Sequence, residues 1–177
     1  MTAIPVPAEP DDTALVERVR SRDPEAMGLL YWRHAPALLR TAYAITLSPE
    51  DAEEVVQDVF VALPSTLAGY EERGRLLSWL KRIVARRALT LLRGRRPTPR
   101  VLGADDCEVA PRVTLDGLAV HEALAALSPE LRIIVVLRVL EGYSHEEIAR
   151  IVGIRPGTSE VRLHRALNRL RQTLGET

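Results

Sequence analysis

The chain has 177 residues, and its 24 basic side chains match its 24 acidic ones, so the net charge is zero. Hydrophobic residues make up 46%, enough for packed cores, and the low aromatic content of 4% favours helices over β-sandwiches or barrels. The single cysteine, Cys107, excludes an internal disulfide, and no cluster has the spacing of metal ligands. The longest apolar run, IIVVL at 133–137, is too short to cross a bilayer, and the N-terminus lacks a secretory signal pattern. We therefore expect an all-α cytoplasmic protein without membrane insertion.

The neutral total conceals an uneven distribution of charge. Residues 1–74 hold 6 basic and 13 acidic side chains, residues 75–100 hold 9 basic and no acidic ones, and residues 101–177 hold 9 and 11. A central block of nine positive charges without one acid favours a polyanionic partner over a merely solvated surface.

Two helices are predicted in the first 46 residues. Asp11 and Asp12 precede the first, whose apolar stripe is Leu15, Val16 and Val19. Asp23 is the predicted N-cap of the second, with Pro24 at its first helical position, and Pro36 predicts a kink or break within it.

A third helix is predicted over 48–63, because Ser48 and Pro49 form a helix start and acidic residues follow in the first turn. Apolar residues recur at steps of three and four, so one face is buried. The opposite face carries Asp51, Glu54, Gln57 and Asp58. An acidic face of this kind indicates only solvation when no further context is considered.

A fourth helix is predicted over 75–96, after a glycine-flanked loop at 68–74. One side is apolar and includes Trp79, which we assign to the core, and the other side is rich in arginine. Residues 97–114 contain several prolines and lack helical periodicity, which predicts a flexible linker. The expected organisation is a disordered N-terminus at 1–11, two small helical domains at 12–96 and 115–177, and a linker at 97–114.

The second predicted domain ends in a helix-turn-helix. Helices are expected from about Leu115, over 128–142 and over 145–152, and the last of these begins with the capping-box spacing of Ser144 and Glu147. Gly153 supplies the turn, and a final helix starts at Pro156 or Gly157.

The final helix has two predicted faces. Leu163, Leu167, Leu170 and Leu174 form the core side. The opposite side carries Val161, His164, Arg165, Asn168 and Gln172. Arginine and asparagine can make paired hydrogen bonds to guanine and adenine, and valine can contact a thymine methyl group. Thr158 at the helix start and the flanking Arg162 are suited to phosphate. The alternative is an amphipathic hairpin with a solvated arginine face.

Taken together, these segments resemble the extracytoplasmic-function (ECF) class of bacterial RNA polymerase sigma factors, from about residue 12 to 174. DAEEVVQDVF at 51–60 and SWLKRIVARRALTLLR at 78–93 resemble motifs of the family's domain two. LSPELRIIVVLRVLEGYSHEEIARIVGIRPGTSEVRLHRALNRLR at 127–171 resembles its domain four. The order and spacing of these motifs carry the resemblance.

The resemblance implies a transcription initiation factor that binds core polymerase at the β′ clamp helices and the β flap, recognises promoter DNA and melts it. An anti-sigma factor is an expected partner. The polymerase-binding residues would be Asp51, Glu54, Gln57 and Asp58. Minus-ten DNA would be bound by Arg82, Arg86, Arg87 and Arg93. Minus-thirty-five DNA would be bound by Thr158, Glu160, Val161, Arg162, His164, Arg165 and Asn168.

The chain departs from the family's usual motifs at four positions. Arg86 stands where asparagine is common, Thr90 where an aspartate is common, Ser159 where an apolar packing residue is common, and Glu160 where a base is common. Two other functions stay open at this point: a stand-alone helix-turn-helix regulator, and a sigma-like decoy that binds a regulator. No catalytic residue, metal or cofactor is expected.

Overall fold

The computed structural model describes residues 10–71, 74–94 and 115–174, and within these ranges the chain is helical without a β-strand. The helices are α1 (Asp12–Arg20), α2 (Pro24–Thr46), α3 (Pro49–Thr66), the short 3₁₀ turn η1 (Leu67–Gly69), α4 (Leu76–Gly94), α5 (Leu115–Ala125), α6 (Pro129–Val135), the π-helical turn η2 (Val136–Leu140), α7 (His145–Val152) and α8 (Pro156–Leu174). The all-α expectation is confirmed. The predicted linker at 97–114 and the first nine residues lie outside the described ranges.

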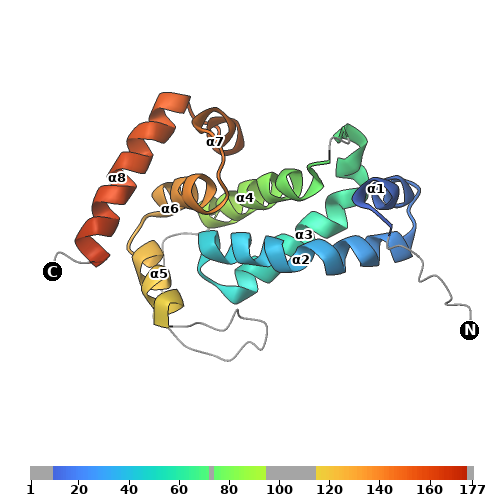
Figure 1. The fold of residues 1–177 in the computed structure, drawn as a ribbon, viewed down its shortest axis with the longest axis horizontal. Coiled ribbons are helices and arrows are strands. Elements are labelled where there is room, and N and C mark those ends of the chain that lie inside the picture. The colour runs from blue at the N-terminus through green and yellow to red at the C-terminus, as the bar shows by residue number, and fades with distance from the viewer. Residues whose placement is uncertain (1–9, 72–73, 95–114, 175–177) are drawn as a thin grey trace, which may run out of the picture.

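Helices α2, α3 and α4 pack against one another and form the first domain, with α1 across one end of this bundle (Figure 1). Its core is aliphatic, with Leu30, Leu38, Val56 and Leu80 almost completely buried. Helices α6, α7 and α8 form the second domain, and α5 packs against α8. Helices α1 and α8 lie at opposite ends of the molecule (Figure 1).

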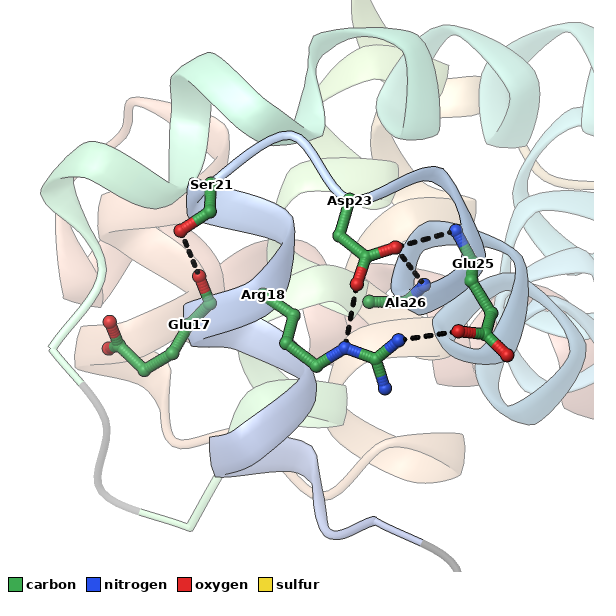
Figure 2. Close-up of polar contacts among 6 residues, drawn as sticks. All are labelled: Glu17, Arg18, Ser21, Asp23, Glu25 and Ala26. Carbon is green, nitrogen blue, oxygen red and sulfur yellow. Dashed lines mark hydrogen bonds and ion pairs between the residues drawn. The ribbon is translucent and has the colours of Figure 1, made fainter.

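Acidic residues cap the first two helices, and the cap at Asp23 is the one that the sequence predicted. The Asp11 carboxylate accepts a hydrogen bond from the backbone N–H of Ala14 at 2.8 Å. Asp23 caps α2 in the same manner, and Arg18 of α1 donates to Asp23 and to Glu25, at 2.7 Å in each case (Figure 2). The hydrogen bond from Arg18 lowers the pKa of the Asp23 carboxyl. One guanidinium therefore ties the end of α1 to the beginning of α2.

Two regions differ from the sequence-based expectation. The sequence predicted a kink or break at Pro36, and no break occurs: α2 continues from Pro24 to Thr46, with Ala35 and Leu38 buried on either side of the proline. Pro36 is exposed, so its ring points away from the core. The uniform helix expected over 128–142 instead changes to the π-helical turn η2 before it ends at Gly142, whose φ of 75° suits glycine.

The two domains share one continuous cluster of buried side chains. At their junction Arg132 of α6 is 8% exposed, and its guanidinium donates at 2.9 Å to the carbonyls of Ile45, Leu124 and Leu127. Ile45 belongs to the first domain, whereas the other two carbonyls lie in or just after α5. Burial lowers the pKa of Arg132 to about 10, which is still well above neutral pH. The buried cation therefore remains charged and is satisfied by carbonyl oxygens from both domains.

Replacing Arg132 with methionine should destabilise the protein, because three carbonyl oxygens lose their donor in a buried setting. The expected loss in the free energy of unfolding is about 3 kcal/mol, measured by urea denaturation. The matched control is Arg40→Met, since Arg40 is exposed on α2. Equal unfolding midpoints for the two variants would contradict this role of Arg132.

Candidate polymerase and promoter interfaces

The acidic side of α3 is accessible along most of its length. Glu54, Gln57 and Asp58 are exposed, while Val55, Val56 and Val59 on the other side are buried in the first domain. The helix begins where predicted, because the Ser48 hydroxyl oxygen accepts from the backbone N–H of Asp51 at 3.2 Å. Three of the four predicted polymerase-binding side chains thus form one exposed acidic stripe, which we name the α3 acidic face (Glu54, Gln57 and Asp58).

Asp51 does not lie on this face in the way that the helical pattern predicted. Its residue surface is only 2% exposed, and Thr46 and Ser48 in the preceding turn are buried as well. The junction between α2 and α3 therefore buries Asp51, while Glu50 beside it stays exposed. A helical wheel places Asp51 beside Asp58, but it cannot show that one end of the helix is covered. The expectation of an exposed Asp51 was wrong.

The four arginines predicted to bind minus-ten DNA all lie on α4, but in two different settings. Arg86, Arg87 and Arg93 are exposed, and among the described residues Arg87 and Arg93 have no ion-pair or hydrogen-bond partner. Arg82 and Arg86 instead contact the second domain. Arg82 donates to Glu147 at 2.8 Å and lies over the Tyr143 ring, 5.4 Å from its centroid. Arg86 donates to the carbonyls of Arg150 and Ile151 at the end of α7.

Trp79 of α4 is half-buried and packs on Tyr70, with 4.7 Å between the ring centroids. Its side chain also packs against the core cluster. The prediction that this tryptophan belongs to the core is confirmed.

The helix-turn-helix forms for the local reasons expected. The Ser144 hydroxyl oxygen accepts from the backbone N–H of Glu147 at 3.2 Å, and the Glu147 carboxylate accepts from the backbone N–H of Ser144 at 3.0 Å, which completes the capping box. Gly153 ends α7 with a φ of 77°. The backbone N–H groups of Gly153 and Ile154 both donate to the carbonyl of Ala149, which closes the turn tightly.

The core side of α8 is centred on smaller residues than the sequence suggested. Ser159 and Ala166 are fully buried, and Leu163 and Leu170 are partly buried against the core. Leu167, also predicted on this side, is half-buried, and the side chain of Leu174 is outside the described residues. Small residues allow α8 to approach α7 and α6 closely, and leucine periodicity alone could not reveal this.

Ser159 has a polar partner in the position where the family commonly packs an apolar side chain. Its hydroxyl lies 2.9 Å from Nδ1 of His145, the first residue of α7. This hydrogen bond satisfies a buried hydroxyl and joins the two helices of the helix-turn-helix. The departure at Ser159 is therefore accommodated by a specific contact with no effect on the fold.

The residues predicted to read minus-thirty-five DNA share the outward side of α8. Thr158, Glu160, His164, Arg165 and Asn168 are exposed, Val161 is 51% exposed, and Arg162 is half-buried. Asn168 lies 3.2 Å from the His164 ring and accepts from Arg171 at 2.7 Å, so its amide is oriented by two neighbours. This arrangement presents charged and amide hydrogen-bonding groups on one helix of a size that fits the major groove.

Comparisons with known proteins cover both domains. The sigma-70 region 2 family matches residues 30–98, and the sigma-70 region 4 family matches residues 117–170. The RNA polymerase sigma factor CarQ of Myxococcus xanthus is 33% identical over 167 residues, which cover 91% of this chain and 96% of CarQ. The ECF RNA polymerase sigma factor SigM of Mycobacterium tuberculosis is 32% identical, with 94% and 86% covered.

The chain belongs to the ECF class of the sigma-70 family. As a sigma factor, it binds core RNA polymerase and directs promoter recognition and transcription initiation. No helix in the described ranges is long and apolar enough to cross a membrane.

Solved sigma factors share this fold over most of the chain. CnrH, determined in complex with the cytosolic domain of CnrY, is 28% identical with a TM-score of 0.60, over 90% of this chain and 94% of CnrH. RpoE of Bartonella quintana, determined with the anti-sigma factor NepR, is 25% identical with a TM-score of 0.61, over 83% and 95%. The two-domain architecture of this sigma factor is thus that of its relatives.

Glu147 gives the helix-turn-helix a dependence on pH. The hydrogen bond from Ser144 is the main cause that lowers the pKa of its carboxyl below the ordinary 4.5, and Arg82 adds to the effect. Because the folded pKa lies below the unfolded one, the stabilisation is complete above about pH 4.5 and is lost as the pH falls through the folded value.

We therefore expect Glu147→Gln to reduce stability at pH 7 by on the order of 1 kcal/mol, since the side chain is partly exposed, while glutamine retains the capping geometry. The difference between wild type and variant should shrink as the pH falls from 6 to 3, as measured by urea denaturation at each pH. Glu122→Gln, at an exposed position of α5, is the control. A difference that stays constant with pH would contradict this role of the Glu147 charge.

Proposed function

We propose that this sigma factor uses three separate surfaces on its two domains: one binds core polymerase, one binds the minus-ten element and one binds the minus-thirty-five element. Residues 12–96 would bind core polymerase and the minus-ten element, residues 115–177 would bind the minus-thirty-five element, and residues 97–114 would join them. The observation that carries this proposal is the segregation of charge. The α3 acidic face lies on one helix, while exposed arginines lie on α4 and α8.

The α3 acidic face is suited to a basic protein surface, and we assign it to the β′ clamp helices of core polymerase. Glu54, Gln57 and Asp58 are held on a rigid helix whose opposite side is packed in the core, so they can dock without ordering a loop. Asp51 would act indirectly, by holding the first turn of α3 in place.

Helix α4 would bind the separated nontemplate strand at the minus-ten element through Arg82, Arg86, Arg87 and Arg93. Melting needs no catalytic group. If the strand binds this surface more tightly than duplex does, binding shifts the equilibrium toward the melted state. The absence of acidic residues between 75 and 100 supports such a preference for a polyanion.

Helix α8 would read the minus-thirty-five element in the major groove. His164, Arg165, Asn168 and Val161 would contact base edges, and Thr158 and Arg162 would contact phosphates. Glu160 lies on the same exposed side and can accept from cytosine, which would give this sigma factor a promoter preference different from relatives with a base there.

An anti-sigma factor is the natural regulator of such a protein in the cytoplasm. The relatives CnrH and RpoE were each determined with a partner protein, and for RpoE that partner is the anti-sigma factor NepR. This likeness supports a protein inhibitor for the present chain.

Asp58→Arg should weaken capture of this sigma factor by core polymerase, because it reverses a charge on the α3 acidic face. We expect at least a tenfold loss in affinity in a pull-down titration with purified core enzyme. Glu122→Arg makes the same charge change on exposed α5 and should bind as wild type does. Undiminished capture of the Asp58 variant would show that the α3 acidic face is only a solvated surface and does not bind polymerase.

Arg165→Ala should weaken binding to the upstream promoter element. The promoter is first selected from a randomised pool with holoenzyme, and affinity is then measured on duplexes with and without the minus-thirty-five sequence. We expect about a tenfold loss on the first duplex and none on the second, because one base contact is removed. Arg40→Ala removes an exposed charge from α2 and is the control. Equal losses on both duplexes would show that Arg165 does not read bases.

A further inference from the structure

Three exposed side chains on the outward side of α8 are joined by hydrogen bonds. Nη1 of Arg171 donates to Oδ1 of Asn168 at 2.7 Å, and Nδ2 of Asn168 lies 3.2 Å from Nε2 of His164. The three residues lie on the side of α8 opposite the buried Ser159 and Ala166. We call this set the α8 network (His164, Asn168 and Arg171).

The chemistry of these groups fixes the direction of the Asn168 amide. A guanidinium donates and never accepts, so the Asn168 atom that faces Arg171 must be the amide oxygen. The amide nitrogen therefore faces His164, and because an amide nitrogen donates, Nε2 of His164 must accept. A ring nitrogen that accepts carries no proton, so His164 in this arrangement is neutral, with its proton on Nδ1. The amide oxygen thus points toward the C-terminal end of α8 and the nitrogen toward its N-terminal end.

The α8 network uses only half of the hydrogen-bonding capacity of Asn168. An amide oxygen can accept two hydrogen bonds and an amide nitrogen can donate two, and Arg171 and His164 take one of each. Among the described residues, the Asn168 side chain has no further partner. One acceptor and one donor therefore remain, which is the combination that N6 and N7 of adenine require.

The direction of the amide decides which base pair it fits. Adenine presents a donor at N6 beside an acceptor at N7, and their order in the major groove is reversed when A·T is replaced by T·A. An amide that rotates by half a turn can fit either order, whereas an amide held by a neighbour at each end fits only one. Arg171 would therefore act on the base through Asn168, as a positioning residue.

His164 can change its charge under mild conditions, because histidine titrates between about pH 5 and pH 8. Its charged neighbours on α8 are Glu160, four residues before it, and Arg165, the next residue. Helices α5, α6 and α7 pack on other sides of α8, and among the described residues none of their charged side chains forms a hydrogen bond or ion pair with the ring. Protonation places a hydrogen on Nε2, which can then no longer accept from Asn168.

We propose that Arg171 and neutral His164 hold the Asn168 amide in the one direction that reads an A·T base pair of the minus-thirty-five element, and that the preference for A·T over T·A is lost when His164 is protonated. This inference rests on the proposed function of α8. It assigns a base pair to Asn168 and a positioning role to Arg171.

The test uses holoenzyme assembled with the full chain, and a promoter selected with it from a randomised pool. Each base pair of the minus-thirty-five element is reversed in turn, and the pair whose reversal weakens wild type but not Asn168→Ala is the one that Asn168 reads. We expect that pair to be A·T, preferred over T·A by at least about fivefold in competition binding. A different base pair at that position would overturn the proposal.

Arg171→Ala should abolish this preference, because the amide can then rotate. Arg171→Gln retains a donor for the Asn168 oxygen without the charge, so it should keep most of the preference while it weakens binding to both duplexes alike. The matched control is Arg155→Ala, which removes an exposed arginine just before α8 and should leave the ratio of the two affinities unchanged. A wild-type preference in Arg171→Ala would overturn the positioning role.

The role of His164 is tested by measuring the same ratio between about pH 8 and pH 5.5. The preference should fall with the pH, while affinity for DNA of any sequence rises, since protonated His164 adds a positive charge. His164→Gln retains an acceptor for Asn168 and does not titrate, so its preference should stay constant. A wild-type preference that is independent of pH, or one that falls equally in His164→Gln, would overturn this role.

The Asn168→Ala variant separates this inference from the function on which it rests. If Asn168→Ala and Arg165→Ala both respond to every base-pair reversal as wild type does, α8 does not read the minus-thirty-five element and the proposed function fails. If Asn168→Ala loses a preference that Arg171→Ala and the pH series leave intact, α8 reads DNA and only the orientation of Asn168 by its neighbours is wrong.

Discussion

Helix α4 has to bury its apolar side in the first domain and, at the same time, provide anionic partners or water for the cations on its other side. The arrangement of both domains follows from these two requirements. Leu76, Leu80 and Val84 are buried on one side, so the helix cannot turn its cations away from the neighbouring domain without losing its own core. The cations on the other side therefore require water, a polyanion or internal acids. In this structure the second domain supplies internal acids and a helix end to Lys81, Arg82 and Arg86.

The same contact explains how a chain with no net charge can act on DNA. Acidic side chains compensate basic ones over the whole molecule, but they do so on separate surfaces and, where Lys81 and Arg82 of α4 pair with Glu141 and Glu147, across a domain boundary. Electrostatic attraction to promoter DNA then depends on which charged surfaces are exposed, and the net charge of the chain does not predict the strength of that attraction. A change in domain arrangement alters the exposed charge without altering the sequence.

Polar contacts between the domains differ in how readily they can open. Arg132 is buried and donates to three carbonyls, which makes it costly to remove, whereas the side chains of Arg82 and Glu147 are 35% and 28% exposed and retain contact with water. Tyr43 of α2 and His121 of α5 add a ring contact at the same boundary, with 3.0 Å between the hydroxyl and Nδ1. The junction therefore combines a buried anchor at Arg132 with a more exposed pair at Arg82.

The sequence by itself determined the helices, their caps and the outward side of α8, because these depend on neighbours within one or two turns. Asp23, Ser48, Ser144 and Gly153 act where the pattern predicted, and the motif order was enough to indicate the family. Only the tertiary structure decided the burial of Asp51, the small core side of α8 around Ser159, and the pairing of Arg82 and Arg86 with α7. Those features join residues more than ten positions apart or depend on what covers a helix end, and helical periodicity holds no information about either.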